Sequence, residues 1–365
     1  MNKPQYLCYL LAVLVMYGGT VLQYAHGLDD DEHTLLVGAA LALLWLGWIW
    51  TAWRCFSVAV GILAGLAIWC YAGHFAAGET QFLLRYFLSS PSAFLWMCVL
   101  LLLATLLFWL ALWRDSLQFA QLAQQLTWGG VTFGLTGFLV RWHESYLLGP
   151  DSGHIPLSNL YEVLLVFCLI STLFYLYYGA KSDRLLGSLV LLPVAAAILF
   201  VLWYSLTLHA QQIQPLIPAL QSWWMKIHVP ANFIGYGAFS FAAMLGVAVL
   251  LVEHGTLRDR LPRIAILQDL MYRAVALGFL FFTLATFLGA LWAAEAWGAY
   301  WSWDPKETWA FIVWLNYAAW LHMRLVKGWR GRVLAWWAVS GLVLTAFAFI
   351  GVNVWLSGLH SYGSL

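Results

Sequence analysis

The residues best suited to chemistry in this sequence gather in one short stretch. It combines four tryptophans with an aspartate, a lysine and a glutamate, in the order Trp297-Gly-Ala-Tyr-Trp301-Ser-Trp303-Asp304-Pro-Lys306-Glu307-Thr-Trp309. For any single tryptophan here, an interfacial aromatic belt explains the position, because Trp and Tyr favour the membrane surface. A belt has no need of charges inside it. The whole stretch therefore favours a ligand site.

The aromatic and charged side chains of this stretch suit a flat, anionic guest. Aromatic faces pack against a flat apolar macrocycle, and Lys306 or an open helix N-terminus can bind a carboxylate. A porphyrin with two propionates has both features. The stretch therefore predicts a shelf for a molecule of this kind.

Two histidines are expected on the same face of the membrane as this shelf. His228 precedes Pro230 and Asn232, which favour a helix start, and His360 follows the last apolar run of the chain. Two neutral imidazoles at one level can supply both axial positions of a haem iron. We therefore expect His228 and His360 to bind the iron.

His322 is expected at a different depth. It lies 17 residues after Pro305, roughly 25 Å along a helix, near the cytoplasmic end of its span. An ionisable residue within a span is a functional hypothesis by default. An interfacial histidine beside Arg324 explains the position equally well.

His154 and His74 are weaker candidates. His154 precedes Asn159 and Glu162, which can cap the helix that follows, so a loop anchor is the preferred interpretation of His154. His74 lies near the outer end of an apolar run, where surface histidines are common.

The stretch also contains the signature of a helix start. Asp304 is a typical N-cap, Pro305 suits the first helical position, and Glu307 three residues after the cap completes a capping box. A span is therefore predicted to begin at Pro305 and to run inward. The tryptophans before it then lie at the outer surface.

Composition places the whole chain among multi-spanning membrane proteins. It has 365 residues, of which 63% are hydrophobic and only 9% are charged, outside the range of soluble domains. A net charge of +1 gives no indication of nucleic-acid binding. The five cysteines lie in or beside apolar runs and form no Cys-x-x-Cys pair, so no thiol redox role is expected.

The apolar runs predict an all-α transmembrane bundle, since each span needs about 20 apolar residues. We read residues 1–24 as a retained span rather than a signal peptide. The pattern predicts about 11 spans, near residues 5–24, 34–53, 56–77, 92–113, 125–142, 160–179, 185–206, 232–252, 270–292, 305–325 and 333–353.

The basic residues predict the orientation, because cytoplasmic loops carry the excess of Lys and Arg. With the N-terminus inside, only Arg85, Arg141, Lys226 and Lys306 fall outside. The odd number of spans then makes the C-terminus extracytoplasmic. The inner side holds Lys3, Arg54, Arg114, Lys181, Arg184, Arg258, Arg260, Arg263, Arg273, Arg324, Lys327, Arg330 and Arg332.

Together these residues resemble the CcsA (ResC-like) family, the membrane component of the system II cytochrome c synthetase. Two motifs carry the resemblance: the tryptophan-rich WWD signature at 297–309, and His154-x-Pro-Leu-Ser-Asn-Leu-Tyr-Glu162. The Asp-Pro-Lys-Glu ending is more similar to CcsA than to the system I proteins CcmC and CcmF. The resemblance covers roughly residues 125–365, which it identifies as a haem-handling bundle. The spans within 1–124 have no assigned role.

The resemblance implies a haem route and a reaction. Haem b, both substrate and bound ligand, is held in the membrane with help from a histidine matching His322. At the outer site, histidines matching His228 and His360 ligate the iron. The family joins haem vinyl groups to the thiols of Cys-x-x-Cys-His apocytochromes, the activity of a holocytochrome-c synthase type lyase. The implied shelf consists of Trp297, Trp301, Trp303, Asp304, Lys306, Glu307 and Trp309.

The resemblance also implies partners. The chain lacks the large extracytoplasmic domain of CcsB, so a separate CcsB-like membrane protein is expected, together with apocytochrome c. His74 is a candidate for a second intramembrane histidine. The expected location is the bilayer of the bacterial cytoplasmic membrane, or the equivalent thylakoid membrane. No catalytic nucleophile of its own is expected, because the reacting thiols belong to the substrate.

Two alternative functions stay open at this point. A haem exporter or carrier needs the same ligands and the same aromatic shelf, yet forms no bond. A transporter for an unrelated solute predicts that the purified protein contains no haem.

Overall fold

The computed structural model describes residues 3–24, 30–149, 152–356 and 358, and within these ranges it contains helices and no strand. Short π-helical segments interrupt or extend some helices at η1 (Leu84–Leu88), η3 (Tyr175–Gly179) and η6 (Phe347–Gly351). The helices are α1 (Lys3–Gln23), α2 (Asp30–Ile49), α3 (Thr51–Tyr71), α4 (Ala77–Thr80), α5 (Ser90–Arg114), α6 (Leu117–Leu148), α7 (Leu160–Phe174), α8 (Ala180–Ser182), α9 (Gly187–Leu208), α10 (Trp223–Glu253), α11 (Ile264–Trp297), α12 (Pro305–Leu325), α13 (Arg332–Ala346) and α14 (Val352–Trp355).

The hydropathy of these helices confirms the all-α transmembrane architecture. Among the residues that the structure describes, nine helices are long and apolar enough to cross a membrane. Each of the eleven predicted spans overlaps a helix. The spans predicted in α6 and α12 are not among the nine, although these helices have 32 and 21 residues, because their composition is less apolar. The count of eleven and the orientation stay predictions.

The second and third predicted spans meet at a different residue from the one expected. The sequence places the link near Arg54, but α2 ends at Ile49 and α3 begins at Thr51. Arg54 is therefore buried inside α3, where its Nε donates to the carbonyl of Gly47 at 2.7 Å. This hydrogen bond satisfies the guanidinium inside a helix, so Arg54 does not need to lie in a loop. Hydropathy alone does not reveal such a bond.

The chain divides into two compact units. The first comprises Met1–Met97 and Thr132–Gly153, and the second comprises Cys98–Val131 and His154–Leu365. Helices α5 and α6 each contribute one part to either unit.

The first unit is held at one end by the buried carboxylate of Glu144. Its Oε1 accepts hydrogen bonds from the hydroxyl of Tyr71 at 2.5 Å and from the backbone N–H of Ser90 at 2.8 Å. Its Oε2 accepts from the Ser90 hydroxyl. Beside it, the Tyr24 hydroxyl and His143 Nδ1 are hydrogen-bonded. One segment of α6 thereby ties together α3, α5 and the chain that follows α1.

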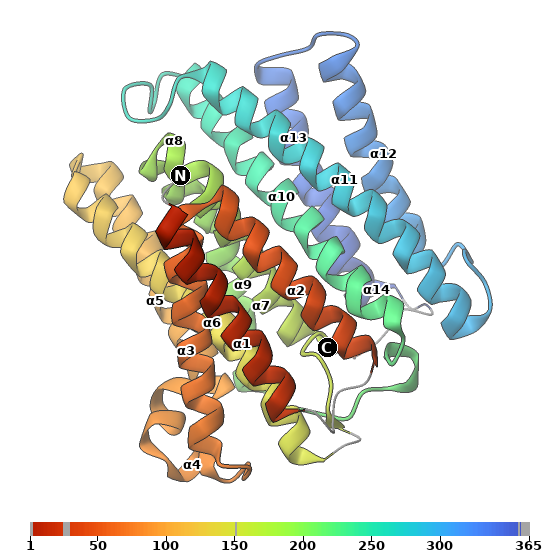
Figure 1. Cartoon of the computed structure of the whole chain (residues 1–365). Helices are drawn as coiled ribbons and strands as arrows, with labels where there is room; N and C mark the ends of the chain where they lie inside the picture. The colour runs from red at the N-terminus through yellow and green to blue at the C-terminus, as the bar shows by residue number, and fades with distance from the viewer. Residues whose placement is uncertain (1–2, 25–29, 150–151, 357, 359–365) are drawn as a thin grey trace. The chain divides into compact units, whose positions relative to one another are not determined.

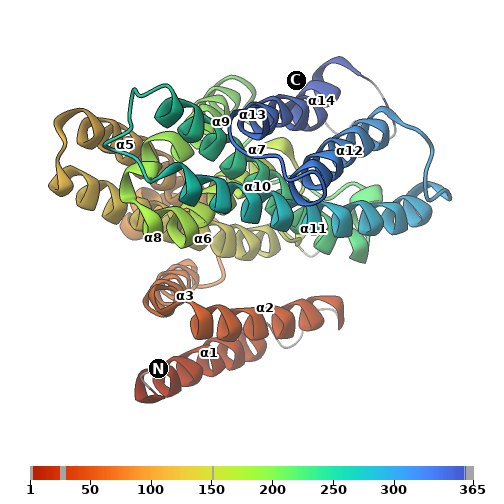
Figure 2. The same ribbon diagram turned by 90° about the horizontal axis from the view of Figure 1, so that it is seen from above.

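The second unit is organised around α10, the most buried of the nine candidate spans. It packs against α7, α9, α11 and α13. Figure 1 shows α10 and α11 running side by side in opposite directions, and they are neighbours again in the view of Figure 2. A glycine also lets α10 approach α13 closely, since a Cβ on Gly246 would lie 2.8 Å from the carbonyl oxygen of Ala335.

Candidate functional site

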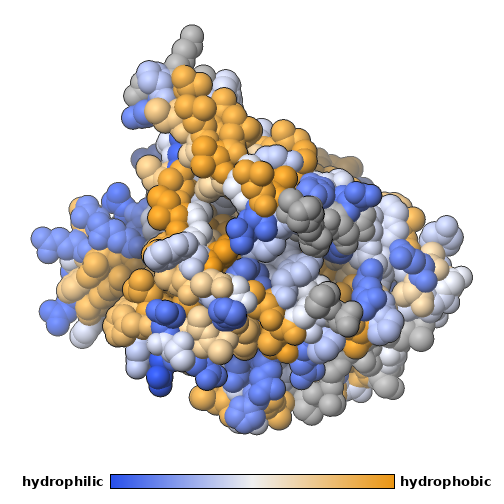
Figure 3. All heavy atoms as spheres, turned by 60° about the horizontal axis from the view of Figure 1, so that its bottom comes forward, coloured by the Kyte–Doolittle hydropathy of each residue, from blue (hydrophilic) through white to orange (hydrophobic). Residues whose placement is uncertain are grey.

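A pocket of about 210 Å³ lies in the second unit where α7, α10 and α12 begin and α11 ends. The loop between α11 and α12 and the segment Ala348–Asn353 complete its walls. Figure 3 views the molecule from the side of these helix ends, and hydrophilic and hydrophobic residues are interleaved there. A mixed polar and apolar lining is typical of small-molecule sites.

His228 lines this pocket from inside a helix. The sequence predicts a helix start near Pro230 and Asn232, but α10 begins at Trp223, with the Ser222 hydroxyl as N-cap. His228 therefore occupies the second turn. Its position is fixed by the helix rather than by a loop.

The tautomer of His228 follows from its hydrogen bond. Nδ1 lies 2.7 Å from the carbonyl oxygen of Ala285 in α11. A carbonyl can only accept, so Nδ1 carries the proton and the neutral ring has its lone pair on Nε2. This is the arrangement of a metal-binding histidine whose other nitrogen donates to a carbonyl.

One face of α11 forms the seat of the His228 ring. Gly289 lies against it so closely that a Cβ there would be 2.7 Å from His228 Cε1. Trp292 is stacked on the ring, with centroids 6.1 Å apart and planes inclined by 25°. The Trp292 indole donates to the carbonyl of Ala219 at 2.7 Å and meets Trp297 edge-on at 5.1 Å. Gly289 and Trp292 of α11 thus both lie against the imidazole.

The start of α12 confirms the predicted capping box. The Asp304 side chain accepts from the N–H groups of Lys306 at 2.9 Å and Glu307 at 3.2 Å, with Pro305 at the first helical position. The Glu307 carboxylate accepts in return from the N–H of Asp304 at 3.3 Å, and it also accepts from the N–H of Ser302 at 2.6 Å. Both carboxylates are buried. The cap fixes the loop that carries the tryptophans.

Lys306 provides the positive charge of the pocket wall. Its Nζ donates to the carbonyl of Phe349 at 3.2 Å and lies 5.7 Å from the centre of the Phe349 ring. Asn353 donates to the same carbonyl at 3.0 Å. The cation is therefore anchored while it lines the pocket.

The tryptophans of the signature do not form a single surface. Trp301 lines the pocket and meets Trp303 edge-on at 5.7 Å. Trp303 is 68% exposed and has a φ of 58°, in the left-handed region. Trp309 packs against Phe347 with centroids 4.3 Å apart. Trp297 ends α11 behind Trp292.

The structure brings together some of the predicted site residues and not others. His228, Trp301, Lys306 and Glu307 line one pocket. Asp304 supports it through the cap.

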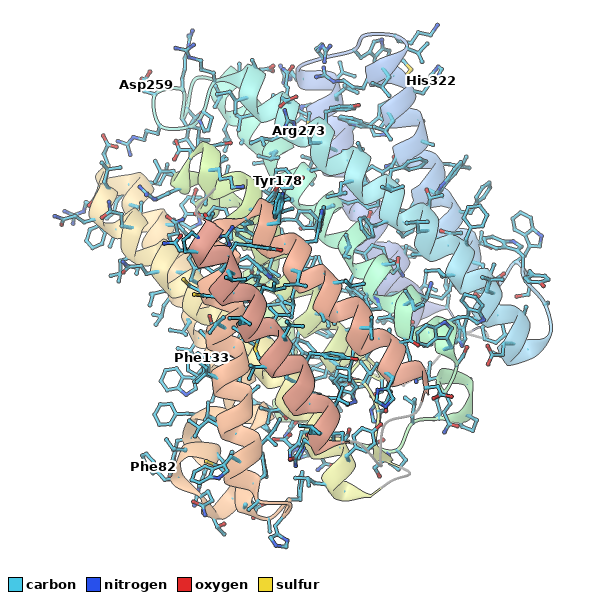
Figure 4. All side chains as sticks on the ribbon, viewed as in Figure 1. Phe82, Phe133, Tyr178, Asp259, Arg273 and His322 are labelled. Atoms are coloured by element: carbon cyan, nitrogen blue, oxygen red, sulfur yellow. The ribbon has the colours of Figure 1, made fainter. Side chains whose placement is uncertain are left out.

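The other candidate histidines that the structure describes are not among the residues that line this pocket. His322 is exposed in the last turn of α12, at the opposite end of that helix from the cap, as Figure 4 shows. His154 is buried just before α7. His74 is exposed in the first unit. His360 lies outside the described residues.

Several pocket residues escape sequence reasoning. Asn232 and Asn353 are lone amides at the edges of apolar runs, a signal that marks polar sites in spans. Gly289, Tyr236 and Phe349 give no such signal, because a glycine or an aromatic residue is ordinary in a transmembrane helix.

Comparison with known proteins decides the family. The family model of the cytochrome c assembly protein matches residues 157–360, a range that includes every residue lining the pocket. The chain belongs to the cytochrome c assembly protein family. The resemblance seen in the tryptophan signature is thereby confirmed.

Curated members of the family are similar along most of this chain. The cytochrome c biogenesis protein CcsA of Chlamydomonas reinhardtii is 42% identical over 62% of this chain and 64% of its own length. The protein of the same name from Parasynechococcus marenigrum is 38% identical over 70% of this chain and 90% of its own length.

A solved structure shares the fold. The cytochrome c heme lyase CcmF matches with a TM-score of 0.57 over 72% of this chain and 48% of that chain. At 22% identity, this likeness concerns the fold alone.

Proposed function

We propose that this chain binds haem in the pocket lined in part by the tryptophan loop, which connects α11 to α12. We propose further that it promotes the covalent attachment of haem to apocytochromes. The observation that carries the proposal is the bond from His228 Nδ1 to the Ala285 carbonyl, which makes Nε2 the basic nitrogen of a pocket-lining imidazole. Neutral imidazole is a common axial ligand of haem iron. His360 is proposed as the second axial ligand.

The chemistry of the lining fits haem b as the substrate. Lys306 supplies a cation for a propionate, and Tyr300 and Trp301 supply aromatic faces for the macrocycle. We propose that Trp297, Trp303 and Trp309 act indirectly, by fixing the loop and the helices around it. His322 is proposed to hold haem on its way from the cytoplasmic side. His154 is proposed as a loop anchor.

The proposed reaction is addition of a cysteine thiol across a haem vinyl group. The sulfur–hydrogen bond of the thiol breaks, a sulfur–carbon bond and a carbon–hydrogen bond form, the carbon–carbon double bond becomes single, and no group leaves. The addition needs neither an oxidant nor a reductant. The thiols belong to a Cys-x-x-Cys-His apocytochrome, so a protein of this lyase type contributes placement of the vinyl carbons rather than a nucleophile.

The proposed setting is the extracytoplasmic face of a bacterial cytoplasmic membrane or of a thylakoid membrane. We propose that residues 125–365 handle haem and that a separate CcsB-like protein presents the apocytochrome. In the first unit, His74 is the proposed candidate for a further histidine ligand.

Absorbance spectroscopy of the purified protein tests the proposal. We expect the spectrum of bis-histidine haem, loss of that spectrum in His228→Gly, and its return when imidazole is added. A His228→Gly variant with the spectrum of the unchanged protein would contradict the role of His228. His254→Gly, which changes a histidine outside the pocket, is the control.

Co-expression with a CcsB-like partner and an apocytochrome tests the bond-forming step. Covalent haem that appears only when this chain is present supports the lyase. Transfer of haem without thioethers would instead identify a carrier. A purified protein without haem, active after His228→Gly, would identify a transporter for another solute.

A further inference from the structure

We infer that Gly289 is a positioning residue for His228, because its missing side chain lets the imidazole lie on α11 and bond to the Ala285 carbonyl. This inference rests on the proposed function. Gly289 would act through His228, the proposed iron ligand, and would not itself contact the iron.

The seat has a helical spacing. Ala285, Gly289 and Trp292 follow one another at i, i+4 and i+7, and such residues share one face of a helix. The carbonyl of Ala285 accepts a hydrogen bond from His228, Gly289 leaves space for the ring, and the indole of Trp292 stacks on the ring. Only the middle position sets how close the imidazole can come.

A side chain at position 289 is incompatible with the ring where it lies. A Cβ would be 2.7 Å from His228 Cε1 and 3.0 Å from Nδ1. Carbon atoms in contact settle at about 3.5 Å or more. The ring would therefore have to move away from α11 and lengthen its bond to Ala285.

The helices cannot easily separate to absorb the extra methyl group. Gly278 of α11 lies so close to α10 that a Cβ there would be 2.7 Å from Phe239 Cε1. Trp292 is tied to the Ala219 carbonyl at 2.7 Å. Because α11 is held against α10 at Gly278 and against the segment before α10 at Trp292, the imidazole is the part that yields.

Moving the ring alters the ligand in a definite way. Without the carbonyl, Nδ1 and Nε2 compete for the proton, so the lone pair is no longer held on Nε2. Loss of such an outer hydrogen bond typically weakens metal binding by 10-fold to 100-fold.

The test is Gly289→Ala, with Gly278→Ala as a matched control on the same pair of helices. Haem titration of the full-length, haem-free protein in nanodiscs should show at least about tenfold weaker binding for Gly289→Ala. Nitrogen-15 NMR of labelled histidine, recorded without haem, should show loss of the pure Nδ1–H tautomer of His228. Gly278→Ala should alter the folded yield without altering either readout.

A second background separates positioning from general damage. In His228→Gly supplied with imidazole, adding Gly289→Ala should make no further difference to haem binding, because free imidazole can settle away from the methyl group. An equal loss in this background would overturn the inference, and so would unchanged affinity and tautomer in Gly289→Ala alone. If His228→Gly itself binds haem normally, the proposed function fails instead.

Discussion

At the scale of the residue, Asp304 shows how one carboxylate both starts a helix and fixes a loop. It accepts from two N–H groups of α12, and the chain returns to it at Gly358, where a Cβ would collide with the Asp304 carboxylate. The cap is therefore covered from the side of the last helix. Local order at this point sets the geometry of the loop from Trp297 to Asp304.

We expect Asp304→Ala to reduce the haem content of the purified protein. The variant loses about 1 kcal/mol of helix stability with its cap and releases the loop that carries Trp301. Asp304→Asn is the control, because asparagine caps helices equally well. The measurement is the ratio of haem absorbance to protein. A ratio for Asp304→Ala equal to that of the unchanged protein would contradict the link between cap and pocket.

At the scale of the element, the start of α12 is predictable and the start of α10 is not. The Asp304 cap is completed within four residues, so the sequence alone indicates it. Pro230 is also a common helix-start signal, yet it lies inside α10, because neighbouring helices let a span tolerate a proline. The depth and support of His228 therefore depend on packing against α11.

The walls of the pocket show the same limit of sequence reasoning. The tryptophan loop and Lys306 are recognisable by their residue types. The segment around Phe349 and Asn353 joins them only because η6 and α14 lie against α12 in the fold. Hydrophobic periodicity indicates which segments are helices and gives no information about which ends meet.

The hydrogen bonds of Glu144 predict that this residue stabilises the first unit. Glu144→Ala leaves the Tyr71 hydroxyl and both donors of Ser90 without their buried acceptor. We expect a loss of about 3 kcal/mol in the free energy of unfolding. Denaturant unfolding in detergent measures it, with the exposed Glu79→Ala of the same unit as control. Equal stability of the two variants would show that the carboxylate does not hold these helices.

At the scale of the whole molecule, the orientation of the chain in the membrane stays a prediction. It rests on the distribution of Lys and Arg, and the positions of the helices do not test it. We expect a phosphatase fused after Leu365 to be active, because the C-terminus is predicted to be extracytoplasmic. The same enzyme inserted between α10 and α11, beside Arg258 and Arg260, should be inactive. The opposite pattern would invert the predicted orientation, and with it the face on which the pocket opens.

The conformation of Trp303 affects the stability of the loop between α11 and α12. A left-handed φ costs a residue with a side chain on the order of 1–3 kcal/mol, and glycine adopts it freely. The chain nevertheless carries at this position an indole that is 68% exposed. A turn that served folding alone would favour glycine. The loop between α11 and α12 therefore carries backbone strain at Trp303, and glycine at this position would relieve that strain while removing the edge-on contact with Trp301.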